Sequence, residues 1–220
     1  MVSGRRAREA NLTALRRDAK CAPMTSIRAV CVYCGSNAGA DPTFAEAARA
    51  LGRILAENRI RLIYGGGSIG MMGALAGAVL SHGGGVTGII PEFLVNKEHV
   101  LAGAQEIVVT RDMHERKRVM FERADGFVAL PGGIGTLEEL VEQLTWAQLG
   151  RHRKPIVLAN ISGFWEPLSE LIEHMKALGF LHSVRRLNYF IADKVEDIVP
   201  ALRARAVQPA GGNADVLGRM

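Results

Sequence analysis

The sequence predicts a single α/β domain, built as a doubly wound, mostly parallel sheet with helices on both faces. Its 220 residues suit one domain or at most two small ones. Hydrophobic residues make up 48 % and charged residues 22 % of the chain, which excludes global disorder and a coiled coil. Short runs rich in Val, Ile and Leu alternate with helix-length segments, and this alternation implies right-handed crossovers into a parallel sheet.

Seven apolar runs are the expected strands of this sheet. They lie at residues 28–34, 60–64, 85–90, 105–109, 126–130, 155–160 and about 188–192. The expected helices lie at residues 42–58, 69–82, 112–123, 135–149, 165–178 and 194–205. Because the runs lack polar alternation, we expect both faces of the sheet to be covered, as in a Rossmann-like fold. In such folds ligands bind beyond the carboxyl ends of the strands.

The net charge of +5 and the pI near 9.4 raise the question of nucleic-acid binding. Residues 1–23 carry six basic and two acidic side chains, a net +4, and residues 201–220 carry three basic and one acidic, a net +2. Residues 24–200 therefore have a net charge of −1, and no nucleic-acid partner is expected. The predicted organisation is a basic, mobile N-terminal extension (1–26), one domain (27–201) and a mobile C-terminal tail (202–220).

Neither membrane insertion nor secretion is expected from the sequence. No segment reaches the roughly 18 uninterrupted apolar residues that a spanning helix needs. The N-terminal arginines are followed by Glu9-Ala10-Asn11-Leu12-Thr13 rather than by an apolar core, which argues against a secretory signal. A cytoplasmic location is therefore expected.

The three cysteines are Cys21, Cys31 and Cys34, and the last two have the spacing of a redox pair or of half a zinc site. Residues 29–33, however, read as a buried strand, in which positions three apart point to opposite faces. The sequence also holds no second cysteine pair to complete a tetrahedral metal site. We expect no metal and interpret the cysteines as small core residues.

A glycine-rich segment follows the second expected strand. Residues 64–70 read Tyr-Gly-Gly-Gly-Ser-Ile-Gly and satisfy the G-x-G-x-x-G pattern, with Glu92 near the position of a ribose-binding acid. Taken alone, this pattern suggests a nicotinamide dehydrogenase. The pattern normally follows the first strand of its unit, however, and glycines here can also serve close packing of a helix on the sheet. Both interpretations stay open.

A second glycine motif predicts a phosphate site. It reads Leu130-Pro131-Gly132-Gly133-Ile134-Gly135-Thr136-Leu137-Glu138-Glu139. A strand ends in a glycine turn that opens a helix, so free backbone N–H groups, the helix dipole and the Thr136 hydroxyl converge on one point. The Lys of a Walker loop is absent, which argues against a nucleoside triphosphatase.

The helix after this motif has two distinct faces at 100° per residue. The expected core face carries Leu137, Leu140, Val141, Leu144 and Gln148. Glu139 lies opposite, together with Gln143 and Trp146. A carboxylate beside a bound phosphate points to catalysis, whereas Glu138 can simply complement the helix dipole. A Trp away from the core points to an oligomer interface near the site.

A third motif opens the helix expected at 112–123, where residues 112–120 read Asp-Met-His-Glu-Arg-Lys-Arg-Val-Met. Arg116 shares its face with Met113, Val119 and Met120. A guanidinium on an apolar face requires an anion or another hydrogen-bonding partner, which favours a functional role for Arg116. The neighbouring charges are typical of a solvated helix surface.

These motifs together resemble a known family. Met113-His114-Glu115-Arg116-Lys117, followed by Pro131 to Glu139, is similar to the LOG (LONELY GUY) family of cytokinin riboside 5′-monophosphate phosphoribohydrolases, often mislabelled as lysine decarboxylases. The likeness extends from about Ile27 to Ala201 and includes Cys34-Gly35-Ser36, Tyr64 to Gly67, Ile90-Pro91 and Thr145 to Gly150. It implies hydrolysis of the N-glycosidic bond of an AMP-type nucleotide, giving an adenine-type base and ribose 5-phosphate, in a homodimer with sites near the interface.

The resemblance also implies the site residues. The catalytic pair matches Arg116 and Glu139. The substrate contacts match Glu98, Lys117, Gly132, Gly133, Ile134, Gly135, Thr136, Leu137, Glu138 and Thr145, with Gly35, Ser36, Gly66 and Gly67 as further candidates. The chemistry agrees, because an acid near the ribose can stabilise an oxocarbenium-like state or prepare water. No metal or cofactor is expected.

Three alternatives stay open. A general purine 5′-nucleotide nucleosidase would use the same residues with a different base pocket. A noncatalytic carrier of a phosphate-bearing cofactor would need the glycine motif at 130–139 but not Glu139. A nicotinamide dehydrogenase would use the glycine motif at 64–70 instead.

Overall fold

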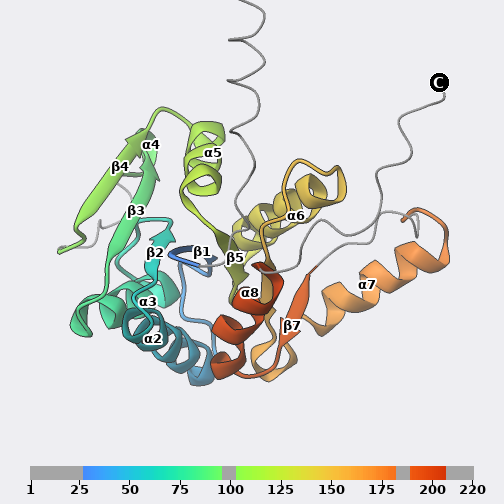
Figure 1. The fold of residues 1–220 in the computed structure, drawn as a ribbon, viewed down its shortest axis with the longest axis horizontal. Helices are drawn as coiled ribbons and strands as arrows, with labels where there is room; N and C mark the ends of the chain where they lie inside the picture. The colour runs from blue at the N-terminus through green and yellow to red at the C-terminus, as the bar shows by residue number, and fades with distance from the viewer. Residues whose placement is uncertain (1–26, 96–102, 182–188, 207–220) are drawn as a thin grey trace, which may run out of the picture.

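The computed structural model describes residues 27–95, 103–181 and 189–206, whose strands form one seven-stranded sheet (Figure 1). The strands are β1 (Ala29–Tyr33), β2 (Arg61–Tyr64), β3 (Val86–Pro91), β4 (Glu106–Thr110), β5 (Gly126–Ala129), β6 (Ile156–Ala159) and β7 (Phe190–Ala192). Their order is β4-β3-β2-β1-β5-β6-β7, and every neighbouring pair is parallel. The chain moves outward from β1 to β4, returns to β5 beside β1, and moves outward again. The predicted doubly wound sheet is confirmed.

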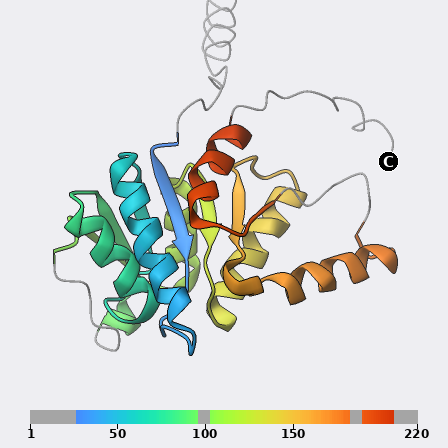
Figure 2. The ribbon, with the colours of Figure 1, turned by 90° about the horizontal axis from the view of Figure 1, so that it is seen from below.

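Helices cover both faces of the sheet (Figure 2). They are α2 (Pro42–Glu57), α3 (Gly70–Ser81), α4 (Glu92–Val95), α5 (Met113–Arg123), α6 (Ile134–Gln148), α7 (Glu166–Ala177) and α8 (Ile198–Ala206), with the 3-10 turns η1 (Ile161–Gly163) and η2 (Val195–Asp197). Buried residues of α2, α3 and α8 form one apolar layer, and those of α5 and α6 form the other.

Successive residues of β1 contribute to these two layers in turn. Val30 and Val32 pack with α2, α3 and α8, whereas Cys31 and Tyr33 pack with α5 and α6. Tyr33 is level with Ala129 of β5, so the carboxyl ends of the two central strands lie side by side. The order of strands reverses between β1 and β5, which is where such sheets bind ligands.

The two described cysteines belong to opposite layers, as predicted from their spacing. Cys31 packs on the α5 and α6 side and Cys34 on the α2 and α3 side, and both are free and buried. Burial raises the pKa of both thiols far above the usual range, which keeps them protonated and supports the interpretation as core residues. Cys21 lies outside the described residues.

The helices nearest the switch between β1 and β5 begin in different ways. The Asp112 carboxylate accepts a hydrogen bond from the Glu115 N–H at 2.8 Å and fixes the start of α5. Helix α6 instead follows Gly133, which has no side chain to cap the helix. The first backbone N–H groups of α6 therefore stay available to a ligand.

Most elements lie within two residues of their predicted bounds, with three differences. Helix α4 and turn η1 were not predicted, because segments of four residues or fewer carry too little periodicity. The helix expected at 194–205 is divided into η2 and α8, a division that places Pro200 in the first turn of α8, where its missing N–H costs nothing. Helix α8 runs to Ala206 and buries Leu202, so the folded part extends past residue 201.

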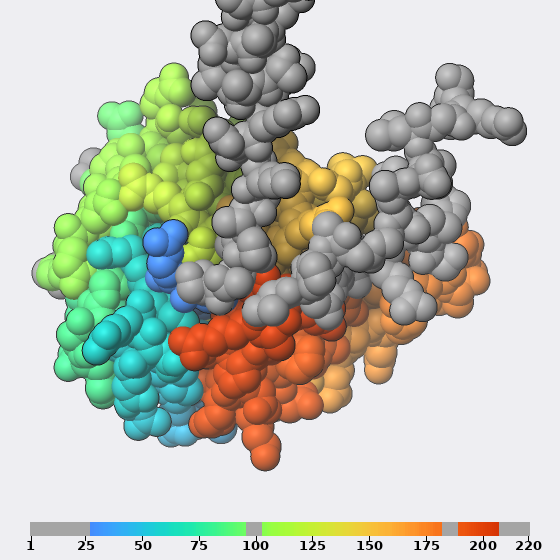
Figure 3. Space-filling model, viewed as in Figure 1, coloured from blue at the N-terminus to red at the C-terminus, as the bar shows by residue number. Residues whose placement is uncertain are grey.

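Residues 190–206 complete the apolar layer that α2 and α3 form on one face of the sheet. In Figure 3 the red-orange surface of the β7 to α8 region lies beside the cyan surface of the α2 and β2 region. The expected mobile extension at 1–26 and residues 207–220 of the expected tail lie outside the described residues. None of the described helices is both long enough and apolar enough to cross a membrane.

Candidate active site

A cavity of about 260 Å³ opens where β1, β2 and β5 end. We call it the site cavity. It is lined by Val32, Tyr33, Cys34, Gly35, Ser36, Gly65, Met72, Met113, Arg116, Met120, Gly133, Ile134, Gly135, Thr136, Glu138 and Glu139. The cavity therefore lies at the predicted edge of the sheet, and it combines one arginine, two glutamates and the start of α6.

Arg116 reaches the cavity from α5 and is almost completely buried, with 7 % of its surface exposed. Its Nε donates to the Ile89 carbonyl oxygen at 3.1 Å and its Nη2 to the Gly65 carbonyl oxygen at 3.3 Å. A Cβ atom at position 65 would collide with Nη2, so the guanidinium needs a glycine there. Both carbonyl partners are neutral, and no carboxylate of the described residues forms a salt bridge with Arg116, which makes its charge a ready partner for a negative group in the cavity.

Glu139 reaches the same cavity from α6 and is 8 % exposed. Burial raises the pKa of its carboxyl from 4.5 to about 7. Arg116 and Lys117 lower this pKa, whereas Glu138 and Glu142 raise it. A carboxyl that titrates near neutral pH suits a general base or acid.

Lys117 joins α5 to α6 rather than lining the cavity. Its Nζ lies 2.5 Å from Glu138 Oε1 and 3.0 Å from Glu142 Oε1. The Lys117 side chain is 9 % exposed, whereas the Glu138 side chain is 51 % exposed. Burial lowers the pKa of Lys117, but hydrogen bonds to Glu138 and Glu142 outweigh it and raise this pKa. The pair holds the two helices that carry Arg116 and Glu139 beside each other.

The start of α6 forms an anion cradle, by which we mean residues 133–136. Gly133, Ile134 and Gly135 are exposed, whereas Thr136 is buried and lines the wall of the site cavity. A Cβ atom at position 132 would collide with Thr136 Oγ1, so Gly132 allows the strand end and the helix to meet closely. The Gly35 N–H donates to the Pro131 carbonyl oxygen at 3.1 Å and ties the two loops together.

Comparison with known proteins shows the family of the chain. A family model described as possible lysine decarboxylase matches residues 72–202. A probable cytokinin riboside 5′-monophosphate phosphoribohydrolase of Oryza sativa subsp. japonica is 48 % identical over 160 residues, which cover 73 % of this chain and 72 % of that protein. The cytokinin riboside 5′-monophosphate phosphoribohydrolase of Rhodococcoides fascians is 42 % identical over 178 residues, which cover 80 % and 90 %. The chain belongs to the LOG family.

The LOG fold extends to proteins of other kinds. The molybdenum cofactor carrier protein of Chlamydomonas reinhardtii superposes with a TM-score of 0.64 over 83 % of this chain and 100 % of the carrier. The two sequences are only 20 % identical, so the likeness shows a common architecture and nothing about the ligand.

The structure brings together many of the residues that the LOG resemblance assigned. Arg116 and Glu139 line one cavity with Gly35, Ser36 and all four residues of the anion cradle. Gly132 lines a neighbouring hollow of about 260 Å³ that shares Gly35, Ser36 and Gly133 with the site cavity. Glu98 lies outside the described residues.

Besides Lys117 and Gly132, four other assigned residues are not in the wall of the site cavity. Gly66 and Gly67 are buried, and the positive φ of Gly66 (86°) shows that this glycine serves the tight turn after β2. Leu137 packs partly buried against the core beneath α6. Thr145 is exposed, and its hydroxyl donates to the Val141 carbonyl oxygen at 2.8 Å.

The predicted core face of α6 is wrong in part. The buried residues of the helix are Thr136, Glu139, Leu140, Gln143 and Leu144. Val141, expected in the core, is 44 % exposed, whereas Glu139 and Gln143 face inward. The helix buries its polar side because that side forms the wall of the site cavity.

Trp146 is half-buried by its own chain. Its ring meets Phe121 edge-on with centroids 5.2 Å apart, and the Arg151 guanidinium lies 4.3 Å from its centroid. Contacts within the chain therefore cover part of the Trp146 ring, and its position no longer requires the oligomer interface expected from the sequence.

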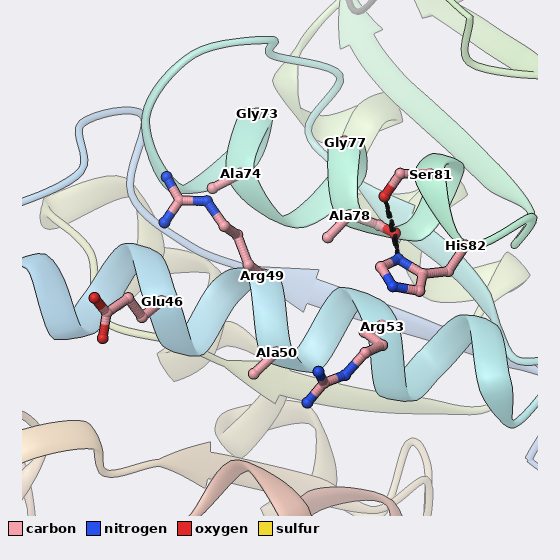
Figure 4. Close-up of a pocket in the computed structure, with 10 residues that line it drawn as sticks. All are labelled: Glu46, Arg49, Ala50, Arg53, Gly73, Ala74, Gly77, Ala78, Ser81 and His82. Carbon is pink, nitrogen blue, oxygen red and sulfur yellow. Dashed lines mark hydrogen bonds between the residues drawn. The ribbon is translucent and has the colours of Figure 1, made fainter.

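Several lining residues were missed from the sequence, among them Tyr33, Gly65, Met72 and Met113. Tyr33 and Gly65 stand at or just after the carboxyl ends of predicted strands, which is the signal that could have found them. A larger hollow of about 580 Å³ lies between α2 and α3, bordered by Arg49, Arg53 and His82 (Figure 4). No residue assigned from the LOG resemblance lines it.

Proposed function

We propose that the protein hydrolyses the N-glycosidic bond of AMP-type nucleoside 5′-monophosphates, including cytokinin riboside 5′-monophosphates, and releases the free base and ribose 5-phosphate. The observation that carries the proposal is the presence of Arg116, Glu139 and the anion cradle in one cavity. Membership of the LOG family supports it, because the relatives are named for this reaction.

The 5′-phosphate occupies the anion cradle. The free N–H groups at the start of α6 and the Thr136 hydroxyl can donate to phosphate oxygens, and the helix dipole favours the negative charge. Phosphate binding away from the breaking bond supplies energy that orients the ribose. Adenosine, which lacks the phosphate, should therefore be a much poorer substrate than AMP.

The ribose lies over Glu139 and Arg116. Glu139, as the carboxylate, takes a proton from the attacking water while the water oxygen bonds to C1′. The C1′–N bond breaks, its electron pair stays on the base, and the base gains one proton from solvent while Glu139 returns its own proton to solvent, so that one water is consumed in all. The Glu139 carboxylate also stabilises the positive charge that develops on the sugar, and Arg116 holds the nucleotide and stabilises the departing base.

We also propose that two copies pair through α6. Ile134, Val141 and Leu149 are 81 %, 44 % and 66 % exposed, and their spacing of seven and eight residues places them on one face of the helix. Ile134 also borders the site cavity, so a second copy would close the cavity from outside. A cytoplasmic location and no nucleic-acid partner complete the proposal, in line with the net charge of −1 over residues 24–200.

The test is incubation with AMP, isopentenyl-AMP, GMP and adenosine, with both products measured. Equal amounts of free base and ribose 5-phosphate from AMP or isopentenyl-AMP support the proposal. Equal rates with GMP identify a general purine 5′-nucleotide nucleosidase. Tight nucleotide binding without product would indicate a carrier.

A further inference from the structure

Behind Glu139 lies a group of buried polar atoms that the proposed reaction does not use. Gln143 is completely buried, and neither Nε2 nor Oε1 of its amide has a hydrogen-bond partner among the described residues. Glu142 Oε2 likewise has no partner among the described residues, and the Tyr33 hydroxyl has only a weak interaction with the buried Cys31 thiol. Buried polar atoms are almost always paired in native proteins, so several unpaired ones in one place require an explanation.

These atoms adjoin the catalytic carboxyl. Gln143 follows Glu139 by four residues on the same buried face of α6, a spacing that places two Cβ atoms about 6 Å apart. Tyr33 ends β1 and lines the site cavity together with Glu139. Its ring is held parallel to that of Phe127, with centroids 6.1 Å apart.

The other charged and titratable groups around Glu139 already have partners or stay protonated. Arg116 binds two carbonyl oxygens, and Lys117 is paired with Glu138 and Glu142. Cys31 and Cys34, on the β1 side, are kept protonated by burial. Within the described residues no hydrogen bond reaches the Glu139 carboxyl, and the donors left beside it are the unpaired Gln143 amide and the Tyr33 hydroxyl, whose only partner is the weakly accepting Cys31 thiol.

We propose that Gln143 and Tyr33 are positioning residues for Glu139, and that their donors hydrogen-bond its carboxylate, directly or through one ordered water, when a nucleotide fills the site cavity. The inference rests on the proposed function. Donors of this kind favour the charged form of an acid and fix its orientation, so they keep Glu139 available as a base. An apolar residue of the same size would suit the fully buried position of Gln143 better unless the amide had a partner.

The first test measures the pKa of the Glu139 carboxyl by carbon NMR on protein with labelled glutamate, assigned by loss of the signal in Glu139→Gln. Gln143→Leu and Tyr33→Phe remove the donors with little change of volume, and Gln148→Leu on the same helix is the matched control. We expect the pKa to rise by about one unit in each of the first two variants, measured with AMP bound, and to stay unchanged in the control. An unchanged pKa in both variants overturns the inference.

The second test follows AMP hydrolysis against pH. For a pKa that rises by one unit, the ionised fraction and with it kcat fall about fivefold at a pH equal to the parent's pKa, and the loss disappears two to three units above that pH, with KM within twofold of the parent. If Gln143 and Tyr33 are only structural, their variants change the melting temperature but not the pH profile of kcat. An unchanged pH profile would therefore also overturn the inference. If Gln143→Leu fails to fold, Tyr33→Phe carries both tests. A parent that releases no base refutes the proposed function alone, because the NMR measurement needs no turnover.

Discussion

Glu139→Gln should stabilise the protein above neutral pH while it removes activity. Burial raises the pKa of Glu139 from 4.5 to about 7. The charged form is therefore disfavoured in the folded state, and stability is lost as the pH rises from about 4.5 through 7. A shift of this size, at about 1.4 kcal/mol per pKa unit, corresponds to about 3 kcal/mol above pH 8.

The assay is thermal unfolding of parent and variant at pH 5 and pH 8.5. The variant should melt roughly 6–12 °C higher than the parent at pH 8.5, with a much smaller difference at pH 5. Glu122→Gln is the control, because Glu122 is more than half exposed and pairs with Arg118 only at 3.7 Å. A gain for Glu139→Gln that is absent at pH 8.5, or equal at both pH values, would refute the argument that burial perturbs Glu139.

Three further predictions concern the arginine, its glycine and the surface of α6. Arg116→Lys should lose at least tenfold in kcat/KM for AMP, because one ammonium cannot replace a planar group held by the Ile89 and Gly65 carbonyl oxygens; activity equal to the parent would remove the planar role. Gly65→Ala should lose a similar factor with the fold intact by circular dichroism, because the new Cβ displaces the guanidinium; a fully active variant would show that Arg116 tolerates displacement. Val141→Glu should shift a dimeric parent toward monomer in sedimentation velocity and lower activity, and a parent that is monomeric from the start contradicts the α6 interface.

The strands and most helices could be predicted because their information is local. Continuous Val, Ile and Leu runs between glycine turns fix a strand that is covered on both faces, and the structure differs by no more than two residues at their ends. That Arg116 needs hydrogen-bonding or anionic partners was also predictable, because it lies on the apolar face of its helix. That the partners are the carbonyl oxygens of Ile89 and Gly65 depends on two other strands, which no local pattern reveals.

The orientation of α6 could not be predicted for a different reason. The periodicity of the helix places Leu137 and Val141 on an apolar face, but an apolar face can meet either the core or a second molecule. In the structure the face with Glu139 and Gln143 is buried, and Val141 is exposed. The polar residues turn inward because the site itself is part of the interior.

The most direct test of the account compares binding and turnover of AMP in the parent and in Glu139→Gln. We predict that the parent releases adenine and ribose 5-phosphate in equal amounts. The variant should bind AMP with a Kd within a few-fold of the parent but lose at least about 100-fold in kcat, as expected for removal of a general base. A parent that binds AMP without releasing adenine, or a variant that turns over as fast as the parent, would contradict the claim that Glu139 makes this cavity a nucleotide hydrolase.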